Sequence, residues 1–86
     1  MLGYQIRKSA VSIPSNIAEG KARHYTPVYV QQLWTAHGSE AELETQLELG
    51  CRIEVVTPKE AMELLADAQE VGRMLQGLIH SLPTQK

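Results

Sequence analysis

The sequence is poor in the residues that build disulfide frameworks or large aromatic cores. It has one cysteine, Cys51, no phenylalanine, three tyrosines and one tryptophan. A single cysteine excludes an internal disulfide and gives no sign of an oxidising compartment. With so few aromatic side chains, the core must be built from Leu, Ile, Val and Ala, which suits helix packing better than a β-sandwich.

Long apolar segments are also missing. No run approaches the ~20 residues of a membrane span, and no signal peptide precedes the first polar residues. We therefore expect a cytoplasmic protein with no membrane partner. The 86 residues predict one domain, residues 1–86, and a chain this short buries only about 60% of its unfolded surface. Its stability as a monomer is expected to be marginal.

The net charge of −2 is unevenly distributed along the chain. The first 25 residues hold one acidic side chain, Glu19, against four cations: Arg7, Lys8, Lys21 and Arg23. Residues 40–70 hold most of the acidic side chains and two cations, Arg52 and Lys59. Such asymmetry can steer a charged partner, and it can equally reflect two solvated helix faces.

The clearest predicted element is a helix over residues 58–82. Thr57 is typical of an N-cap, Pro58 of the first helical position, and Glu60 completes a capping box. An apolar stripe at steps of three and four follows, and Pro83 ends it. The stripe consists of Ala61, Leu64, Leu65, Ala68, Val71, Leu75, Leu78, Ile79 and Leu82.

A second helix is predicted over residues 27–53, with Thr26 as its cap. Its apolar positions form two stripes, so the helix should touch two neighbours, or one neighbour and another subunit. The first stripe is Tyr29, Leu33, Ala36, Leu43 and Leu47; the second is Val30, Trp34, His37 and Ala41. Gly38 in the interior predicts close approach of another helix. The helix could end at Gly50 or continue to about Ile53, and residues 53–56 could also be read as a strand without a partner.

A third helix is predicted over residues 2–20, ending at Gly20. Pro14 inside it removes a backbone hydrogen bond and predicts a kink, with hydroxyls of the flanking serines serving the exposed backbone groups. These serines are Ser9, Ser12 and Ser15. The fold class predicted from periodicity is thus all-α, with three long helices.

The segment from Gln5 to Gly20 resembles a characteristic segment of the bacterial proteins encoded by intervening sequences of 23S ribosomal RNA. A second similar stretch comprises Ala36, Gly38, Ser39 and residues 41–47, and a weaker one comprises residues 74–75, 77–79 and 81–82. This resemblance implies an up-and-down four-helix bundle that assembles as a homo-oligomer, with a pentamer favoured. Family members usually begin with an additional helix, so the three helices here would correspond to helices two to four.

The family that the sequence resembles is related to the accessory variability protein of diversity-generating retroelements, for which the resemblance implies binding of nucleic acid and a reverse transcriptase through a basic surface. The resemblance therefore makes RNA or DNA a candidate partner of this chain. The residues available for phosphate contact are Arg7, Lys8, Lys21, Arg23 and His24. They can equally be solvated side chains that pair with the many glutamates.

His37, Glu40 and Glu44 share a helix face and are candidate ligands of a metal ion, which would need at least one more ligand from another helix or subunit. A histidine hydrogen-bonded to a carboxylate explains this spacing better, because such pairs are common on helices. Cys51 lacks an adjacent base, and no catalytic serine constellation or phosphate-binding glycine loop is present. We expect no enzymatic activity, no metal, no cofactor and no small-molecule substrate.

Helix packing or a subunit interface is the expected role of the remaining singled-out residues: Ile6, Ile13, Pro14, Asn16, Ile17, Glu19, Trp34, His37, Gly38, Leu43 and Leu47. Two hypotheses follow for a homo-oligomeric, non-enzymatic bundle. It is a nucleic-acid-associated accessory factor acting through its basic surface, or it is a purely structural or protein-interaction bundle.

Overall fold

Over the described residues, 1–83, the protein folds into three long helices. The computed structural model describes residues 1–83 and consists of α1 (Leu2–Ala22), α2 (Thr26–Arg52) and α3 (Pro58–Ser81). The prediction of an all-α fold with three helices is confirmed, and each helix boundary differs from the expected one by at most two residues. Residues 53–56 form a turn, so neither a strand nor a longer α2 occurs there.

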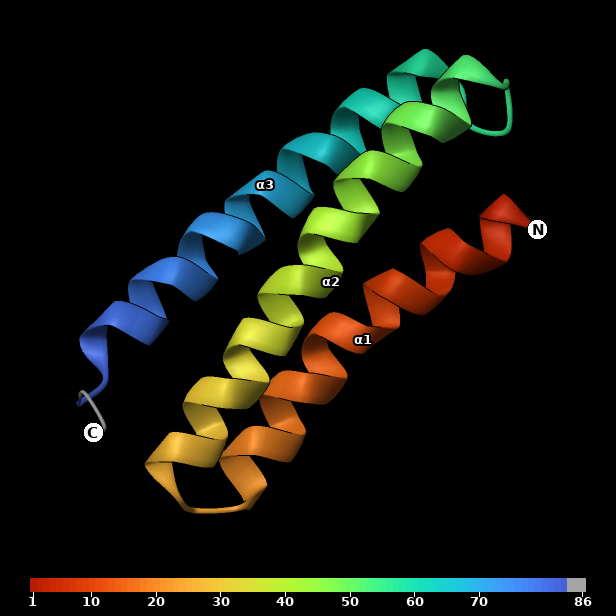
Figure 1. The fold of residues 1–86 in the computed structure, drawn as a ribbon. Helices are drawn as coiled ribbons and strands as arrows, with labels where there is room; N and C mark the ends of the chain where they lie inside the picture. Colours follow the sequence, from red (N-terminus) through yellow and green to blue (C-terminus); the bar gives the residue numbers. More distant parts are fainter. Residues whose placement is uncertain (84–86) are drawn as a thin grey trace.

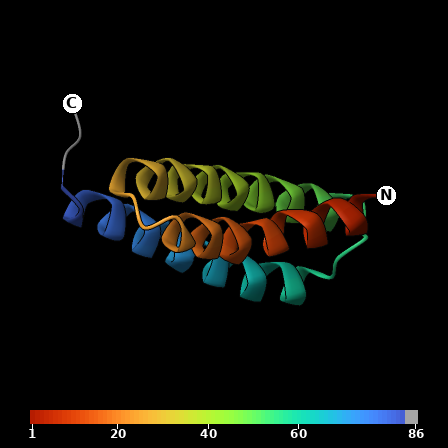
Figure 2. The same ribbon diagram turned by 90° about the horizontal axis from the view of Figure 1, so that it is seen from below.

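The central helix, α2, lies beside both other helices, and each neighbouring pair is antiparallel (Figures 1 and 2). The start of α1 therefore lies at the same end of the bundle as the turn between α2 and α3 (Figure 1). No Cα atom of α1 lies within 8 Å of a Cα atom of α3. The bundle is consequently two helix hairpins that share α2, and the side between α1 and α3 is not closed by direct backbone packing.

The core is aliphatic and is centred on the first apolar stripe of α2. Leu33 and Leu47 are almost completely buried, at 0% and 1% exposure. The other buried hydrophobic residues that pack with them are Ile13, Ala36, Leu43, Ala68, Leu75 and Ile79. All three helices contribute to this cluster, which agrees with a core built without phenylalanine.

The N-terminus of α3 has the predicted capping box. The Glu60 backbone N–H donates to the Thr57 hydroxyl at 3.2 Å, and the Thr57 N–H donates to Glu60 Oε1 at 3.0 Å. These two bonds satisfy amides that a helix leaves without internal partners. The Thr57 N–H and then the Thr57 hydroxyl, which both donate to Glu60 Oε1, hold the pKa of the Glu60 carboxyl below its ordinary value.

Two predicted helix ends are wrong. Thr26 is the first residue of α2 and not its cap; the cap position is Tyr25, whose side chain makes no capping bond. Gly20 lies inside α1 and not at its end. A Cβ atom at position 20 would stand 2.7 Å from Gln32 Cβ, so this glycine allows α1 and α2 to approach each other.

The α2–α3 turn contains a residue other than glycine in the left-handed backbone conformation. Glu54 has φ 62°, a backbone conformation that residues with a Cβ atom rarely adopt. The turn is closed because Val55 N and Val56 N both donate to the carbonyl of Gly50, at 2.8 and 3.1 Å. Gly50 is thus part of the last turn of α2, and the left-handed position falls four residues later.

Candidate functional site

The five candidate phosphate-contact residues are exposed, but they do not form one patch. Arg7 and Lys8 lie in the first half of α1, whereas Lys21 lies in its last turn and Arg23 and His24 in the turn that follows. The fourteen positions from Arg7 to Lys21 correspond to about 21 Å along a helix. The cations are therefore divided into two groups at opposite ends of α1.

The residues assigned to helix packing or an interface are found in three environments. Ile13, Leu43 and Leu47 are buried in the core, and Ile6 and Ile17 pack against it. Glu19, Pro14 and Gly38 are exposed, and Trp34 is 46% exposed. Asn16 and His37 are partly buried. The core positions thus serve packing within the chain, whereas Pro14 and Trp34 remain accessible to other molecules.

The close approach of another helix expected at Gly38 does not occur within residues 1–83, whereas a place for Gly38 in a subunit interface stays a prediction. A Cβ atom at position 38 would have nothing within 4 Å, so no helix backbone approaches there. Besides Gly20, a glycine that does allow a close approach to α2 is Gly72 in α3, where a Cβ atom would lie 2.5 Å from Glu40 Oε1. The close contact expected at α2 therefore occurs between α2 and α3, with the glycine on the other helix.

Ser12 connects α1 to α2 through its hydroxyl. Its Oγ lies 2.8 Å from Ser39 Oγ, and Asn16 Nδ2 donates to the Ser12 carbonyl at 2.8 Å and to Ser12 Oγ at 2.9 Å. The expectation that this hydroxyl serves the backbone around Pro14 is therefore wrong, since it is used between helices. Helix α1 continues through Pro14 to Ala22.

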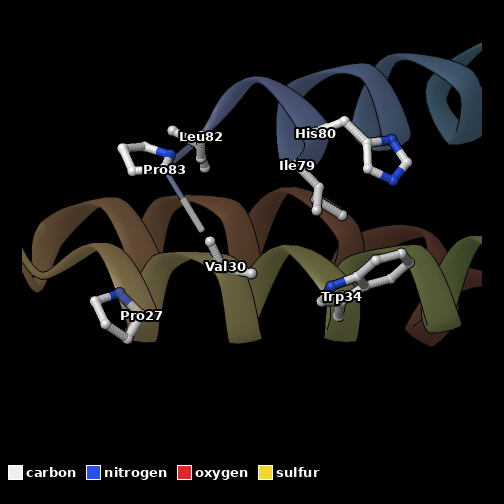
Figure 3. A pocket seen from close by; sticks show the side chains of 7 residues that line it. All are labelled: Pro27, Val30, Trp34, Ile79, His80, Leu82 and Pro83. Carbon is white, nitrogen blue, oxygen red and sulfur yellow. The ribbon is translucent and has the colours of Figure 1, made fainter. Parts of the chain in front are cut away.

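Trp34 forms one wall of a hollow between α2 and the end of α3. The hollow holds about 390 Å³ and is lined by Pro27, Val30, Ile79, His80, Leu82 and Pro83 besides the tryptophan (Figure 3). The Trp34 ring meets His37 and His80 edge to face, with centroids 5.6 and 6.5 Å apart. His37 therefore packs against an aromatic ring, whereas the carboxyl of Glu40 is turned into the α2–α3 contact.

Glu40 is the polar residue whose burial sequence reasoning missed. It is 3% exposed, and its Oε2 has no hydrogen-bond partner. Burial, followed by the hydrogen bond and the charge of Glu44, raises the pKa of the Glu40 carboxyl from 4.5 to about 7. The sequence does hold a signal for this burial. Positions 36, 40, 43 and 47 follow the steps of three and four of a buried helix face, and Glu40 occupies one of these positions between Ala36 and Leu43.

A second hollow lies between α1 and α3, and we call it the α1–α3 groove. It holds about 270 Å³ and is lined by Asp67 and by apolar residues of all three helices: Ile6, Ala10, Ile13, Pro14, Leu43, Leu47, Leu64, Ala68 and Val71. Leu64 is 47% exposed although it belongs to the apolar stripe of α3. The groove continues toward the start of α1, where Gly3 and Arg7 face Val55, Val56 and Glu63.

The two rims of this groove carry opposite charge. Arg7 lies on the α1 side, and Glu60, Glu63 and Asp67 lie on the α3 side of the same hollow. Over residues 1–83, the one ion pair is between Arg73 and Glu70, within α3. The charged side chains on the two rims are therefore solvated and not paired across the groove.

The fold and these surfaces define a small helical bundle with an open apolar side. The model of the 23S rRNA-intervening sequence protein family matches residues 1–77. The chain belongs to this family, as the segment from Gln5 to Gly20 predicted.

A solved structure supports the same assignment. The chain is similar to a protein of unknown function from the S23 ribosomal protein family of Bacteroides thetaiotaomicron, with 28% sequence identity and a TM-score of 0.87. The match covers 92% of this chain and 73% of that chain. The comparison with curated proteins gave no match. A relation to the accessory variability protein of retroelements stays a prediction.

Of the helices formed by residues 1–83, none is both long enough and apolar enough to cross a membrane.

Proposed function

We propose that this protein is a non-enzymatic helical-bundle protein that acts by association, first with copies of itself. The observation that carries this proposal is the α1–α3 groove. Apolar area exposed to water costs roughly 25 cal/mol per Å², and contiguous exposed apolar patches mark interaction sites. A chain of 86 residues has little other stabilisation to offset that cost.

The placement of the polar groups supports a non-catalytic role. Ser12 bonds to Ser39 between α1 and α2, and Asn16 donates to Ser12 within α1. The Glu40 carboxyl is buried between α2 and α3 beside Gly72. A substrate could reach it only if these two helices moved apart. These groups fix how the helices fit together, which is the work expected of polar residues in a bundle core.

The molar mass in solution tests self-association. We expect multi-angle light scattering and sedimentation equilibrium to give a mass above one chain, increasing with protein concentration. The resemblance implies a ring of five copies, and the same measurement gives the number. A mass of one chain at every micromolar concentration would contradict the proposal.

Nucleic-acid association is a second candidate, supported by the exposed and unpaired cations at both ends of α1. In an oligomer these two small groups are repeated, so that weak contacts act together. The family description, which refers to intervening sequences of 23S ribosomal RNA, gives the choice of probe.

Fluorescence anisotropy of a labelled structured RNA and a labelled DNA duplex tests this candidate. Binding should weaken as salt increases, because phosphate contacts release counterions. Lys21→Glu should weaken it further. Lys59→Glu is the matched control, because it reverses the same charge at an exposed position of α3. Equal effects of the two substitutions would show that net charge, and not α1, determines binding.

A further inference from the structure

One end of the bundle, which we call the Trp34 end, differs in charge from the rest of the molecule. The α1–α2 turn and the end of α3 lie together there, because α1 and α3 are both antiparallel to α2 (Figures 1 and 2). All acidic side chains except Glu19 lie in residues 40–70. Residues 20–39 and 74–83, which form the Trp34 end, contain no acidic side chain but all three histidines and two cations: His24, His37, His80, Lys21 and Arg23. This end therefore attracts anionic ligands.

The two cations lie near the hollow beside Trp34. Lys21 and Arg23 are exposed, and within residues 1–83 neither forms an ion pair. Pro27 lines the hollow and follows Arg23 by four residues, a length of chain that spans at most about 14 Å. A stacked strand of nucleic acid carries a phosphate about every 3.4 Å, so this distance corresponds to about four nucleotides. A strand bound at Arg23 thus reaches the hollow.

The hollow presents an aromatic ring and hydrogen-bonding nitrogens side by side. Trp34 is 46% exposed, and its ring is held edge to face by His37 and His80. Figure 3 shows Trp34 and His80 pointing toward each other from α2 and α3. The ring nitrogens of a histidine can hydrogen-bond the edge of a ligand. The remaining walls are apolar, and the volume of about 390 Å³ lies in the range of small-molecule sites.

We infer that this hollow binds an unpaired base of a single-stranded nucleic acid, whose phosphates contact Lys21 and Arg23. The site rests on the second candidate function, nucleic-acid association, and names the form of nucleic acid that is bound. A nucleotide combines a planar ring that packs on aromatic side chains with an anionic backbone, and the Trp34 end provides for both. The bases of a duplex are stacked and paired, so they cannot enter the hollow. We therefore expect a preference for single strands.

The other group of cations on α1 is less suited to this ligand. Arg7 shares a hollow with Glu60, Glu63 and Asp67, and these carboxylates repel phosphates. The Trp34 end is therefore the better site for a strand.

The fluorescence of Trp34 tests the site directly, because it is the one tryptophan of the sequence. A short oligothymidylate should quench it in a saturable manner as a base packs against the ring. A strand of the same length made of abasic nucleotides should bind through its phosphates at low salt and leave the fluorescence unchanged. The duplex of oligothymidylate with oligodeoxyadenylate should also leave it unchanged.

Trp34→Ala tests the aromatic contact, with binding followed by the anisotropy of a labelled strand. We expect about tenfold weaker binding of oligothymidylate and unchanged binding of the abasic strand, since the contribution of stacking requires a base. Trp34→Phe keeps an aromatic ring and should keep most of the affinity. Leu49→Ala is the matched control: Leu49 is 47% exposed on the same helix, at the opposite end of the bundle. It should leave both affinities unchanged, and circular dichroism should show all variants helical.

Arg23→Gln tests the phosphate contact separately. It should weaken the binding of oligothymidylate and of the abasic strand by the same factor and reduce the salt dependence of both. Trp34→Ala, in contrast, should affect only the strand that carries bases.

Several outcomes would overturn the inference. Equal affinities for the two strands with unchanged Trp34 fluorescence would remove the hollow as a base site, while salt-dependent binding would leave nucleic-acid association standing. Tighter binding of the duplex than of the single strand would contradict the preference. Quenching by thymidine monophosphate at the same concentrations would make a free nucleotide the occupant in place of a strand. No binding of any of these probes at low salt would contradict nucleic-acid association as well.

Discussion

The carboxyl of Glu40 occupies the space that a side chain at position 72 would need. A Cβ atom on Gly72 would lie 2.5 Å from Glu40 Oε1 and 3.0 Å from Glu40 Cδ. Helices α2 and α3 therefore meet through a buried acid on one side and a missing side chain on the other. The stability of the bundle depends on both residues together.

We expect Gly72→Ala to destabilise the protein by about 1–3 kcal/mol, because the methyl group must displace a packed side chain. Urea unfolding followed by circular dichroism measures this. Gly77→Ala in the same helix is the control, since a Cβ atom there meets nothing within 4 Å. That change should stabilise α3 by up to about 1 kcal/mol. If the contact with Glu40 is the cause, Glu40→Ala should remove most of the penalty of Gly72→Ala.

The stability should also depend on pH through Glu40. Its pKa of about 7 in the folded protein exceeds the ordinary 4.5, so between these values the folded chain holds a proton that the unfolded chain has lost. The contribution of Glu40 to the free energy of unfolding should therefore be highest below pH 4.5 and fall as the pH rises toward 7. The difference amounts to roughly 3 kcal/mol.

Denaturant unfolding at several pH values, compared between the wild type and Glu40→Gln, tests this dependence. The glutamine stays neutral, so the variant should be more stable at pH 8 and should lose most of the decrease between pH 4.5 and 7. Glu42→Gln, at an exposed position of α2, should leave the wild-type profile in place. Parallel profiles for the wild type and Glu40→Gln would show that Glu40 is not the titrating group.

The turn after α2 offers a stabilising substitution. Glu54 has φ 62°, and a left-handed conformation costs roughly 1 kcal/mol for a residue with a Cβ. We expect Glu54→Gly to raise the free energy of unfolding by up to that amount. Glu48→Gly, on the exposed face of α2, should lower it by about 1 kcal/mol. Equal destabilisation by both glycines would contradict the strain assigned to Glu54.

The Ser12–Ser39 contact can be measured as a pair. A double-mutant cycle with Ser12→Ala and Ser39→Ala should give a coupling energy of about 1 kcal/mol, the net value of a typical buried hydrogen bond. Ser15→Ala, at an exposed position of the same helix, should show no coupling to Ser39→Ala. A coupling of zero for Ser12 would mean that water replaces the partner at no cost.

The sequence was most informative where local chemistry decides the structure. Thr57, Pro58 and Glu60 specify the start of α3 through bonds between neighbours in the chain, and the periodic apolar stripe specifies its buried face. The existence and approximate length of all three helices followed from such patterns. The family resemblance carried by residues 5–20 was likewise a property of the local sequence.

The features that were missed depend on which helix faces which. Gly38 and Gly72 have the same local appearance inside a helix, yet only Gly72 faces a neighbouring side chain within 4 Å. Gly20 could end a helix or allow close packing, and the position of Gln32 decides for packing. The burial of Glu40 among several exposed glutamates also follows from packing against α3. The α1–α3 groove could not be predicted, because periodicity does not give the distance between nonadjacent helices.

The sharing of α2 by two helix hairpins has a consequence for how the chain folds. All helix–helix packing joins elements that follow one another in the sequence through short turns. Contacts of such small sequence separation form quickly, since little chain entropy is lost before each contact is made, and helical proteins of this kind fold in microseconds to milliseconds. We therefore expect each chain to complete its two hairpins before it meets another copy, so that assembly begins from folded molecules.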